Sequence, residues 1–114
     1  MKINEHESIL IRLINEQFEV LNYYEGNFRD IYDHYMKKTM TSLKDPYNPK
    51  YPFLTCIDEY DNTFFNWVQI PKLVQELEKL ANEDTDNEFK KAVQNVSEYL
   101  NKIQSLQYIQ FMGD

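Results

Sequence analysis

The spacing of the apolar residues changes period twice along the chain, and the order of these changes constrains the fold more than any other feature. Residues 8–24 are rich in β-forming side chains, apolar residues between 28 and 103 recur mostly at helical intervals, and β-forming residues return at 108–112. Strands at both ends with helices between them favour an α+β domain. We therefore expect a small antiparallel sheet, formed by an N-terminal hairpin and a C-terminal strand, packed against about three helices.

Residues 8–24 carry two runs rich in Ile, Val, Phe and Tyr, separated by the polar break at 15–17. Such runs around a short break are typical of a β-hairpin, although this break lacks a glycine. A helix is the alternative that periodicity leaves open, because five residues also share one helical stripe. These are Leu10, Leu13, Ile14, Phe18 and Leu21. The hairpin is the favoured interpretation.

The first helix is predicted over 28–43 by the spacing of its apolar side chains, with Asn27 as its N-cap. Three prolines follow within 44–52. Because proline lacks an N–H donor and disfavours helical geometry in the residue before it, this stretch is expected to form an extended connector.

Two further helices are predicted in the second half of the chain. One begins at Ile70-Pro71, where proline suits the first helical turn, and extends to about Leu80. The other covers 89–103 and follows Thr85-x-x-Glu88, a spacing that fits a capping box.

Length and cysteine content limit the class of protein. The 114 residues are enough for one compact domain with its own core, so we expect a single domain over 1–114. A single cysteine, Cys56, rules out an internal disulfide and fits a reducing compartment, which makes the cytoplasm the expected location. The sequence has neither a signal-peptide pattern nor a long apolar span, so no membrane association is expected.

The chain is acidic, with 19 Asp and Glu against 12 Lys and Arg and a formal net charge of -7. Nucleic acid is not an expected partner, because the two arginines and the lysines do not cluster into the basic face that phosphate binding needs. A basic protein is the expected partner, since complementary charge speeds encounter. Solubility alone is the competing explanation for the charge.

Residues 57–69 combine carboxylates, amides, a hydroxyl and four aromatic rings without a clean period. This density predicts a shaped loop, a setting in which binding residues concentrate. The candidate partner contacts in this loop are Asp58, Glu59, Tyr60, Asp61 and Trp67, and Asp84 and Asp86 form a second acidic group.

Metal and cofactor chemistry finds little support in the sequence. His6 and His34 are far apart and Cys56 stands alone, so no His or Cys pair has ligand spacing. Asp58, Asp61 and Asn62 lack the register of a calcium loop. We expect no metal site and no cofactor.

Catalysis is likewise not expected. Cys56 with His34 is the one nucleophile and base pair to consider, and Cys56 is predicted to be buried and inert. Asp58 and Asn66 are predicted to satisfy backbone groups of the loop. The alternative is a small enzyme or ligand-binding domain that uses the cluster Asp58, Tyr60, Asp61 and Asn66.

Two motifs resemble a family of small, uncharacterised bacterial proteins. The first is Ile57-Asp58-x-Tyr60-Asp61-x-Thr63-x-Phe65-Asn66-x-x-Gln69 followed by an apolar helix, and the second is the terminal Phe111-Met112-Gly113-Asp114. The likeness covers 52–70 and 108–114, and the first half matches only in its hairpin-like pattern. Glu59 stands where the family has proline, and Trp67 stands where a basic residue is common.

The resemblance implies no enzymatic activity. Small acidic bacterial proteins of this kind look like the immunity proteins of contact-dependent or polymorphic toxin systems, a likeness of class rather than of motif. It implies a non-enzymatic role in which the chain neutralises a cognate toxin domain, expected to be basic, by binding and occluding it. The oligomeric state is left open.

Overall fold

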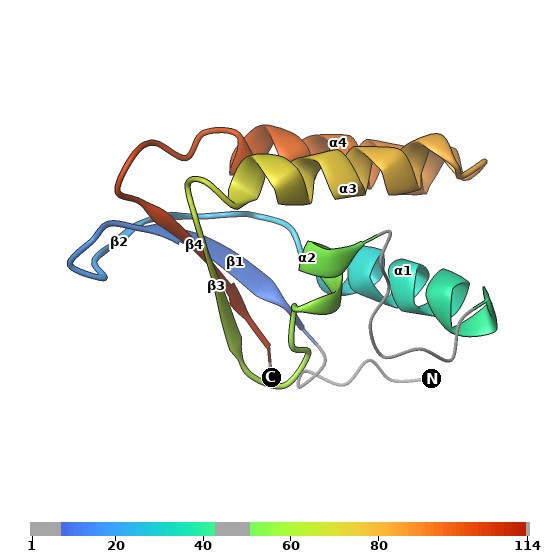
Figure 1. Ribbon diagram of the computed structural model, residues 1–114, viewed down its shortest axis with the longest axis horizontal. Coiled ribbons are helices and arrows are strands. Elements are labelled where there is room, and N and C mark those ends of the chain that lie inside the picture. Colours follow the sequence, from blue (N-terminus) through green and yellow to red (C-terminus); the bar gives the residue numbers. More distant parts are fainter. Residues whose placement is uncertain (1–7, 43–50, 114) are drawn as a thin grey trace.

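The computed structural model describes residues 8–42 and 51–113, and it confirms the α+β class (Figure 1). In chain order the elements are β1 (Leu10–Ile14), β2 (Val20–Tyr23), α1 (Arg29–Ser42), α2 (Pro52–Thr55), β3 (Asn62–Asn66), α3 (Ile70–Asn82), α4 (Asn87–Leu100) and β4 (Tyr108–Met112). In these described ranges, no helix has both the length and the apolar character needed to cross a bilayer.

The sheet has the strand order β2-β1-β4-β3, and every neighbouring pair is antiparallel. The N-terminal hairpin is confirmed, and β4 adds to β1 as predicted. A fourth strand, β3, pairs with the other side of β4. The prediction of a loop throughout 57–69 was therefore wrong, because the backbone of β3 pairs with β4 and the inward Thr63 and Phe65 alternate with outward neighbours.

One face of the sheet is covered by helices. α3 and α4 lie side by side across it (Figure 1), with α1 next to α4 and α2 next to α3. The inward strand residues and the apolar helix stripes form one buried core. Its members from the sheet include Ile11, Leu13, Phe65, Ile109 and Phe111, and those from α3 and α4 include Leu73, Leu77, Val93 and Val96.

The helix starts were predicted with mixed success. Asn27 is confirmed as a cap, since its Oδ1 accepts from the Arg29 N–H at 2.9 Å. Pro71 lies in the first turn of α3, also as predicted. The capping box at Thr85 was wrong, because Asp86 is the N-cap of α4 and accepts from the N–H groups of Glu88 and Phe89 at 2.9 and 3.2 Å.

The ends of two predicted segments also shift. α4 ends at Leu100, and Ile103 packs against the core from the following turn. Most of the predicted connector at 44–52 lies outside the described residues, but its last member, Pro52, begins the short helix α2. Proline is well placed there because its missing N–H falls in a first helical turn.

Candidate functional site

The sheet presents a second face on the side opposite α3 and α4. Because successive strand side chains point to opposite faces, the pairing register identifies the residues that share this side. One row across the sheet consists of Tyr23, Arg12, Gln110 and Phe64. The rows beside it consist of Val20, Ile14, Tyr108 and Asn66, and of Leu10, Met112 and Asn62. We call these three rows the open face.

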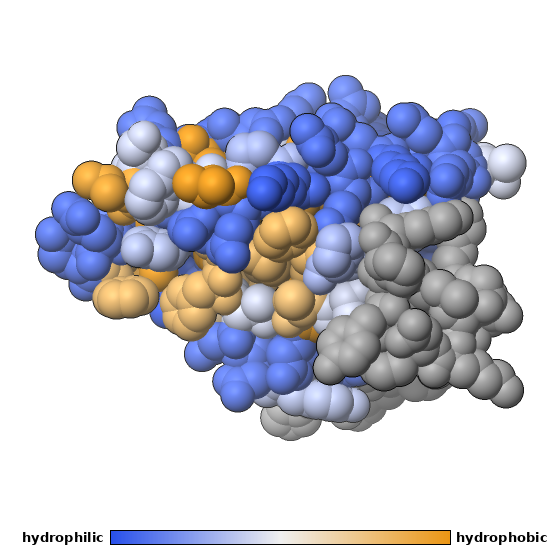
Figure 2. Space-filling view, viewed as in Figure 1, coloured by the Kyte–Doolittle hydropathy of each residue, from blue (hydrophilic) through white to orange (hydrophobic). Residues whose placement is uncertain are grey.

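Large apolar side chains are exposed on the open face. Phe64 is 45% exposed, and Leu10, Val20 and Tyr23 are also exposed. Figure 2 shows apolar side chains, in orange, gathered over the sheet and the loops at its end, whereas the upper helical edge is mostly hydrophilic. Several large apolar side chains exposed on one side of a small acidic protein are typical of a protein contact site.

Phe18 extends the open face from the β1–β2 loop. Its ring is 65% exposed, and its centroid lies 6.1 Å from that of Phe64, edge-on, and 6.1 Å from that of Tyr108, stacked. The loop is held by Asn15, whose Oδ1 accepts from the N–H groups of Gln17 and Glu19 at 3.0 and 2.9 Å. These bonds fix Phe18 above the outer strand residues.

The backbone of Phe18 has φ 63°, in the left-handed region that favours glycine. For an aromatic residue this conformation costs about 1–2 kcal/mol. Strained residues persist where the surroundings fix them, and they concentrate at functional sites. The strain therefore marks this end of the open face as a candidate contact.

Trp67 joins the same cluster of rings. Its centroid lies 6.4 Å from that of Tyr108, and both side chains are half-buried. Trp67 was predicted from the sequence as a partner contact, and the fold places it beside Tyr108 at the end of β3. We call Phe18, Phe64, Trp67 and Tyr108 the aromatic cluster.

Acidic side chains stand at both ends of the sheet. Glu16 and Glu19 lie in the β1–β2 loop at one end, and Asp58 and Asp61 precede β3 at the other. All four are exposed. A partner that covers the open face therefore meets negative charge at either end.

The predicted roles of Asp58 and Asn66 in satisfying backbone groups are confirmed. Asp58 Oδ1 accepts from the Tyr60 N–H at 2.8 Å, and Asn66 Oδ1 accepts from the N–H groups of Val68 and Gln69 at 2.9 Å each. Asp61 also bonds locally, accepting from the Asn62 N–H at 2.7 Å. Asn66 stands about 16 Å along the chain from Asp61, so the alternative ligand cluster is divided between the turn before β3 and the far end of β3.

The two remaining loop candidates differ in what they contact. Glu59 Oε1 accepts from Arg29 Nη2 at 2.9 Å, and Arg29 also lies 3.0 Å from Asp33, so Glu59 ties the loop to α1. Tyr60 is strongly exposed and stays available to a partner.

The second acidic group lies in the turn between α3 and α4. Asp84 is only 8% exposed; its Oδ2 lies 2.6 Å from His34 Nε2 and its Oδ1 accepts from the Asp86 N–H at 2.8 Å. The His34 ring stacks on Phe89. Asp84 therefore holds this turn together and, because it is buried, is unsuited to the surface contact predicted for it. Asp86 is exposed and caps α4.

Cys56 is exposed, so the prediction that it is buried was wrong. It follows the last turn of α2, and its Sγ lies 3.3 Å from the Pro52 carbonyl oxygen on the outside of that turn. The buried neighbours Leu54 and Ile57 take the inward positions instead. Within the part of the chain that the structure describes, no group of three or more His, Cys, Asp or Glu side chains is placed to hold a metal ion.

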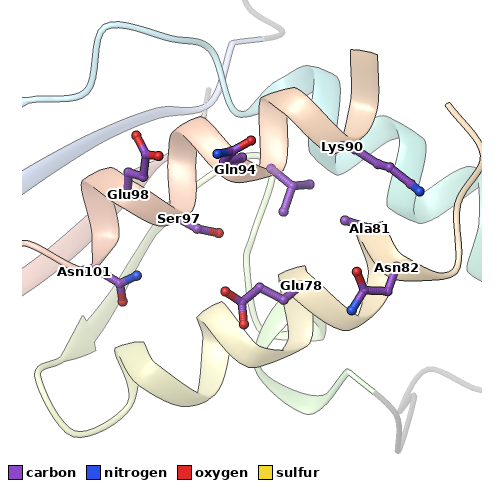
Figure 3. A pocket seen from close by; sticks show the side chains of 9 residues that line it. Glu78, Ala81, Asn82, Lys90, Gln94, Ser97, Glu98 and Asn101 are labelled. Atoms are coloured by element: carbon purple, nitrogen blue, oxygen red, sulfur yellow. The ribbon is translucent and has the colours of Figure 1, made fainter. Parts of the chain in front are cut away.

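Grooves among the helices are lined by described residues as well, and two of them are also candidate sites. A groove of about 280 Å³ between α3 and α4 is lined by polar side chains, including Glu78, Glu98 and Asn101 (Figure 3). At its floor, the hydroxyl of Ser97 is buried and has no hydrogen-bond partner among the described residues. The other groove, of about 330 Å³, lies beside His34 and Phe89. In the first groove no described base is hydrogen-bonded to Ser97, and the described lining of the second groove includes no serine, threonine, cysteine or lysine, so the open face is the stronger candidate.

Comparison with family models, with curated proteins and with solved structures finds no match to this chain. The candidate site therefore stands on the geometry of the chain itself.

Four residues of the open face and its loop were missed as candidates from the sequence. They are Arg12, Phe18, Tyr23 and Tyr108. A signal for them exists in the run 9–14, which is apolar at both alternating positions except for Arg12. A strand of that kind is typical of a sheet with both faces covered. The predicted helices are enough to cover only one face, so the other face would be left for a partner.

Proposed function

We propose that this protein is a non-enzymatic binding protein that docks a protein partner on its open face, and that the partner is a toxin domain which it neutralises as an immunity protein. The observation that carries the docking face is the aromatic cluster, with Phe18 and Phe64 exposed, on the side of the sheet that none of the described helices covers. Rings such as Phe64 offer a partner a large apolar contact area at low cost in conformational entropy.

Charge supports a basic partner. The net charge of -7 and the acidic side chains at both ends of the sheet would attract a positively charged surface and repel an acidic one. The likeness in class to immunity proteins adds that the basic surface belongs to a toxin. The cytoplasm is the proposed place of action, where a toxin that enters the cell would be met.

Two variants test the docking face. Phe64→Ala and Phe18→Ala remove rings that are exposed, so both are expected to leave the fold intact. Truncating a central aromatic contact typically costs 2 kcal/mol or more of binding, which is about a thirtyfold loss of affinity. Gln75→Ala is the matched control, because Gln75 is exposed on α3 and carries no charge.

The probe for the toxin is the product of the gene immediately upstream. Co-purification with that product and protection of cells from it are expected for the wild type, with both weakened in Phe64→Ala and unchanged in Gln75→Ala. A toxin-free neighbourhood with no protection would reject the immunity role. Equal binding by Phe64→Ala and Gln75→Ala would reject the docking face.

Light scattering at several concentrations tests another occupant of the same face. A second copy of the chain covering the open face would appear as a dimer that Phe64→Ala dissociates, and this result would count against a toxin as the normal occupant. A monomer at all concentrations agrees with the proposal.

A further inference from the structure

Arg12 stands at the centre of the open face. Its Cα pairs with Tyr23 on one side and with Gln110 on the other, and Phe64 follows Gln110 across the sheet. Arg12 Nε donates to Gln110 Oε1 at 2.6 Å, and Gln110 is only 4% exposed. One edge of the guanidinium is therefore held by a side chain that is itself fixed in the sheet.

The other edge of the guanidinium is not engaged. Among the residues that the structure describes, Arg12 Nη1 and Nη2 have no hydrogen-bond acceptor, and no carboxylate lies within ion-pair distance of Arg12. Arg12 is half-buried, so water solvates these donors while the face is uncovered. This arrangement contrasts with Arg29, whose guanidinium is paired with Glu59 and Asp33.

Covering the open face would remove that water. Arginine stays protonated at all physiological pH values, so the charge cannot be lost. A buried cation without a counter-charge costs several kcal/mol, and the neighbouring Phe64 and Tyr23 rings supply none of the missing hydrogen bonds. A partner that binds here must therefore bring an acceptor to Arg12.

We propose that the partner places an Asp or Glu carboxylate against Arg12, between Tyr23 and Phe64; this inference rests on the proposed docking function. A carboxylate matches the two free donors of the guanidinium in a bidentate pair. A phosphate backbone would offer similar oxygens but would be repelled by the acidic ends of the sheet. The partner surface is thus basic at its rim and acidic at one central point.

This pattern supplies specificity as well as attraction. Acidic ends select a basic partner, and Arg12 rejects any surface that would place a positive or purely apolar group opposite it. The central pair also fixes the register in which the partner sits, because only one position of the carboxylate satisfies the guanidinium.

The test uses short random peptides displayed on phage and selected on the wild-type chain. Peptides that lose binding to Phe64→Ala are expected to be enriched in Asp and Glu, and their affinity for Arg12→Gln is expected to fall about tenfold or more. Arg12→Lys keeps the charge without the planar fork, so an intermediate loss is expected. Gln110→Glu offers Arg12 an internal carboxylate and should weaken the same peptides.

The same contact can be tested by changing the peptide instead of the protein. Replacing the acidic peptide residue by its amide should weaken binding to the wild type and have little further effect on Arg12→Gln. Selected peptides that depend on Phe64 but show no acidic enrichment, or bind Arg12→Gln as well as the wild type, would overturn the carboxylate inference alone. Peptides indifferent to Phe64→Ala would overturn the docking face and the inference with it.

Discussion

Glu76 is expected to be the polar side chain of α3 that matters most for stability. It is buried, and its carboxylate accepts from the N–H of Phe53 at 3.0 and 3.1 Å and from the N–H of Leu54 at 2.9 Å. These N–H groups lie in the first turn of α2, where no intrahelical acceptor exists. Glu76 therefore anchors α2, which leads to the turn at Asp58 and into β3.

The expected loss for Glu76→Ala follows from these contacts. Two hydrogen bonds to a charged acceptor contribute about 1.5–3 kcal/mol each, and their removal leaves two N–H groups unsatisfied. Burial offsets part of the stability that these hydrogen bonds contribute, because the ionised carboxylate loses contact with water. Desolvation raises the pKa of Glu76, and the hydrogen bonds from the Leu54 and Phe53 N–H groups lower it. We therefore expect a net loss of about 2–3 kcal/mol in the free energy of unfolding.

Urea denaturation followed by circular dichroism measures this loss, with Glu78→Ala as the control. Glu78 lies on the same helix but is exposed, so its replacement should change the free energy of unfolding by no more than about 0.5 kcal/mol. Glu76→Gln, which keeps one acceptor oxygen, should fall between the two. A Glu76→Ala protein as stable as Glu78→Ala would refute the anchoring role of the carboxylate.

Two other positions give predictions of the same kind. Gly113→Ala should destabilise the protein by about 1–3 kcal/mol, because its Cβ would lie 2.6 Å from backbone atoms of Asp58 and Glu59. Gly26→Ala, whose Cβ would lie closest to side-chain atoms of Tyr24 rather than to backbone, should cost less in the same urea denaturation. The buried hydroxyl of Tyr51 donates to Glu83 Oε1 at 2.9 Å, and burial followed by this bond raises the pKa of Tyr51 to about 12. The stability that neutral Tyr51 contributes is fully present below the unfolded pKa of about 10 and is lost as the pH rises towards 12. The free energy of unfolding of the wild type should therefore fall across this pH range, and Tyr51→Phe should make that fall smaller. A fall of the same size in Tyr51→Phe would show that Tyr32 and Tyr99, whose pKa values are also raised to about 12, account for it instead.

The helices α1, α3 and α4 and the two outer segments of the chain were predictable because their periods extend over many residues, whereas the four-residue helix α2 was not predicted. α3 and α4 each keep an apolar stripe for several turns, and β4 places the polar Gln110 between the apolar Ile109 and Phe111. β3 was not predictable in this way, since only Thr63 and Phe65 point inward and the exposed Phe64 between them hides the alternation. Its strand conformation comes from pairing with β4, which lies more than forty residues further along the chain.

The fold also brings together the two segments that carried the resemblance. β3 pairs with β4 over their full lengths, and the Gly113 N–H donates to the Asp61 carbonyl oxygen at 2.9 Å. Gly113 has no room for a side chain because the backbone at 58–59 passes so close to it. The terminal glycine and the central motif therefore form one structural unit, and local sequence reasoning treated them as separate.

The run 9–14 indicates a sheet with apolar side chains on both faces, but which face the helices leave open depends on where they pack, and no local pattern records that. Phe18 is expected to contribute little net stability. Its left-handed backbone costs about 1–2 kcal/mol, and contacts of the buried third of its ring return a similar amount at about 25 cal/mol per Å². Phe18→Gly is therefore expected to change the free energy of unfolding by no more than about 1 kcal/mol, whereas truncation of a core phenylalanine costs about 3–5 kcal/mol. A loss of that larger size, measured by urea denaturation, would show that Phe18 belongs to the core. A small loss of stability together with a large loss of partner binding would show that the strained ring is kept for the contact.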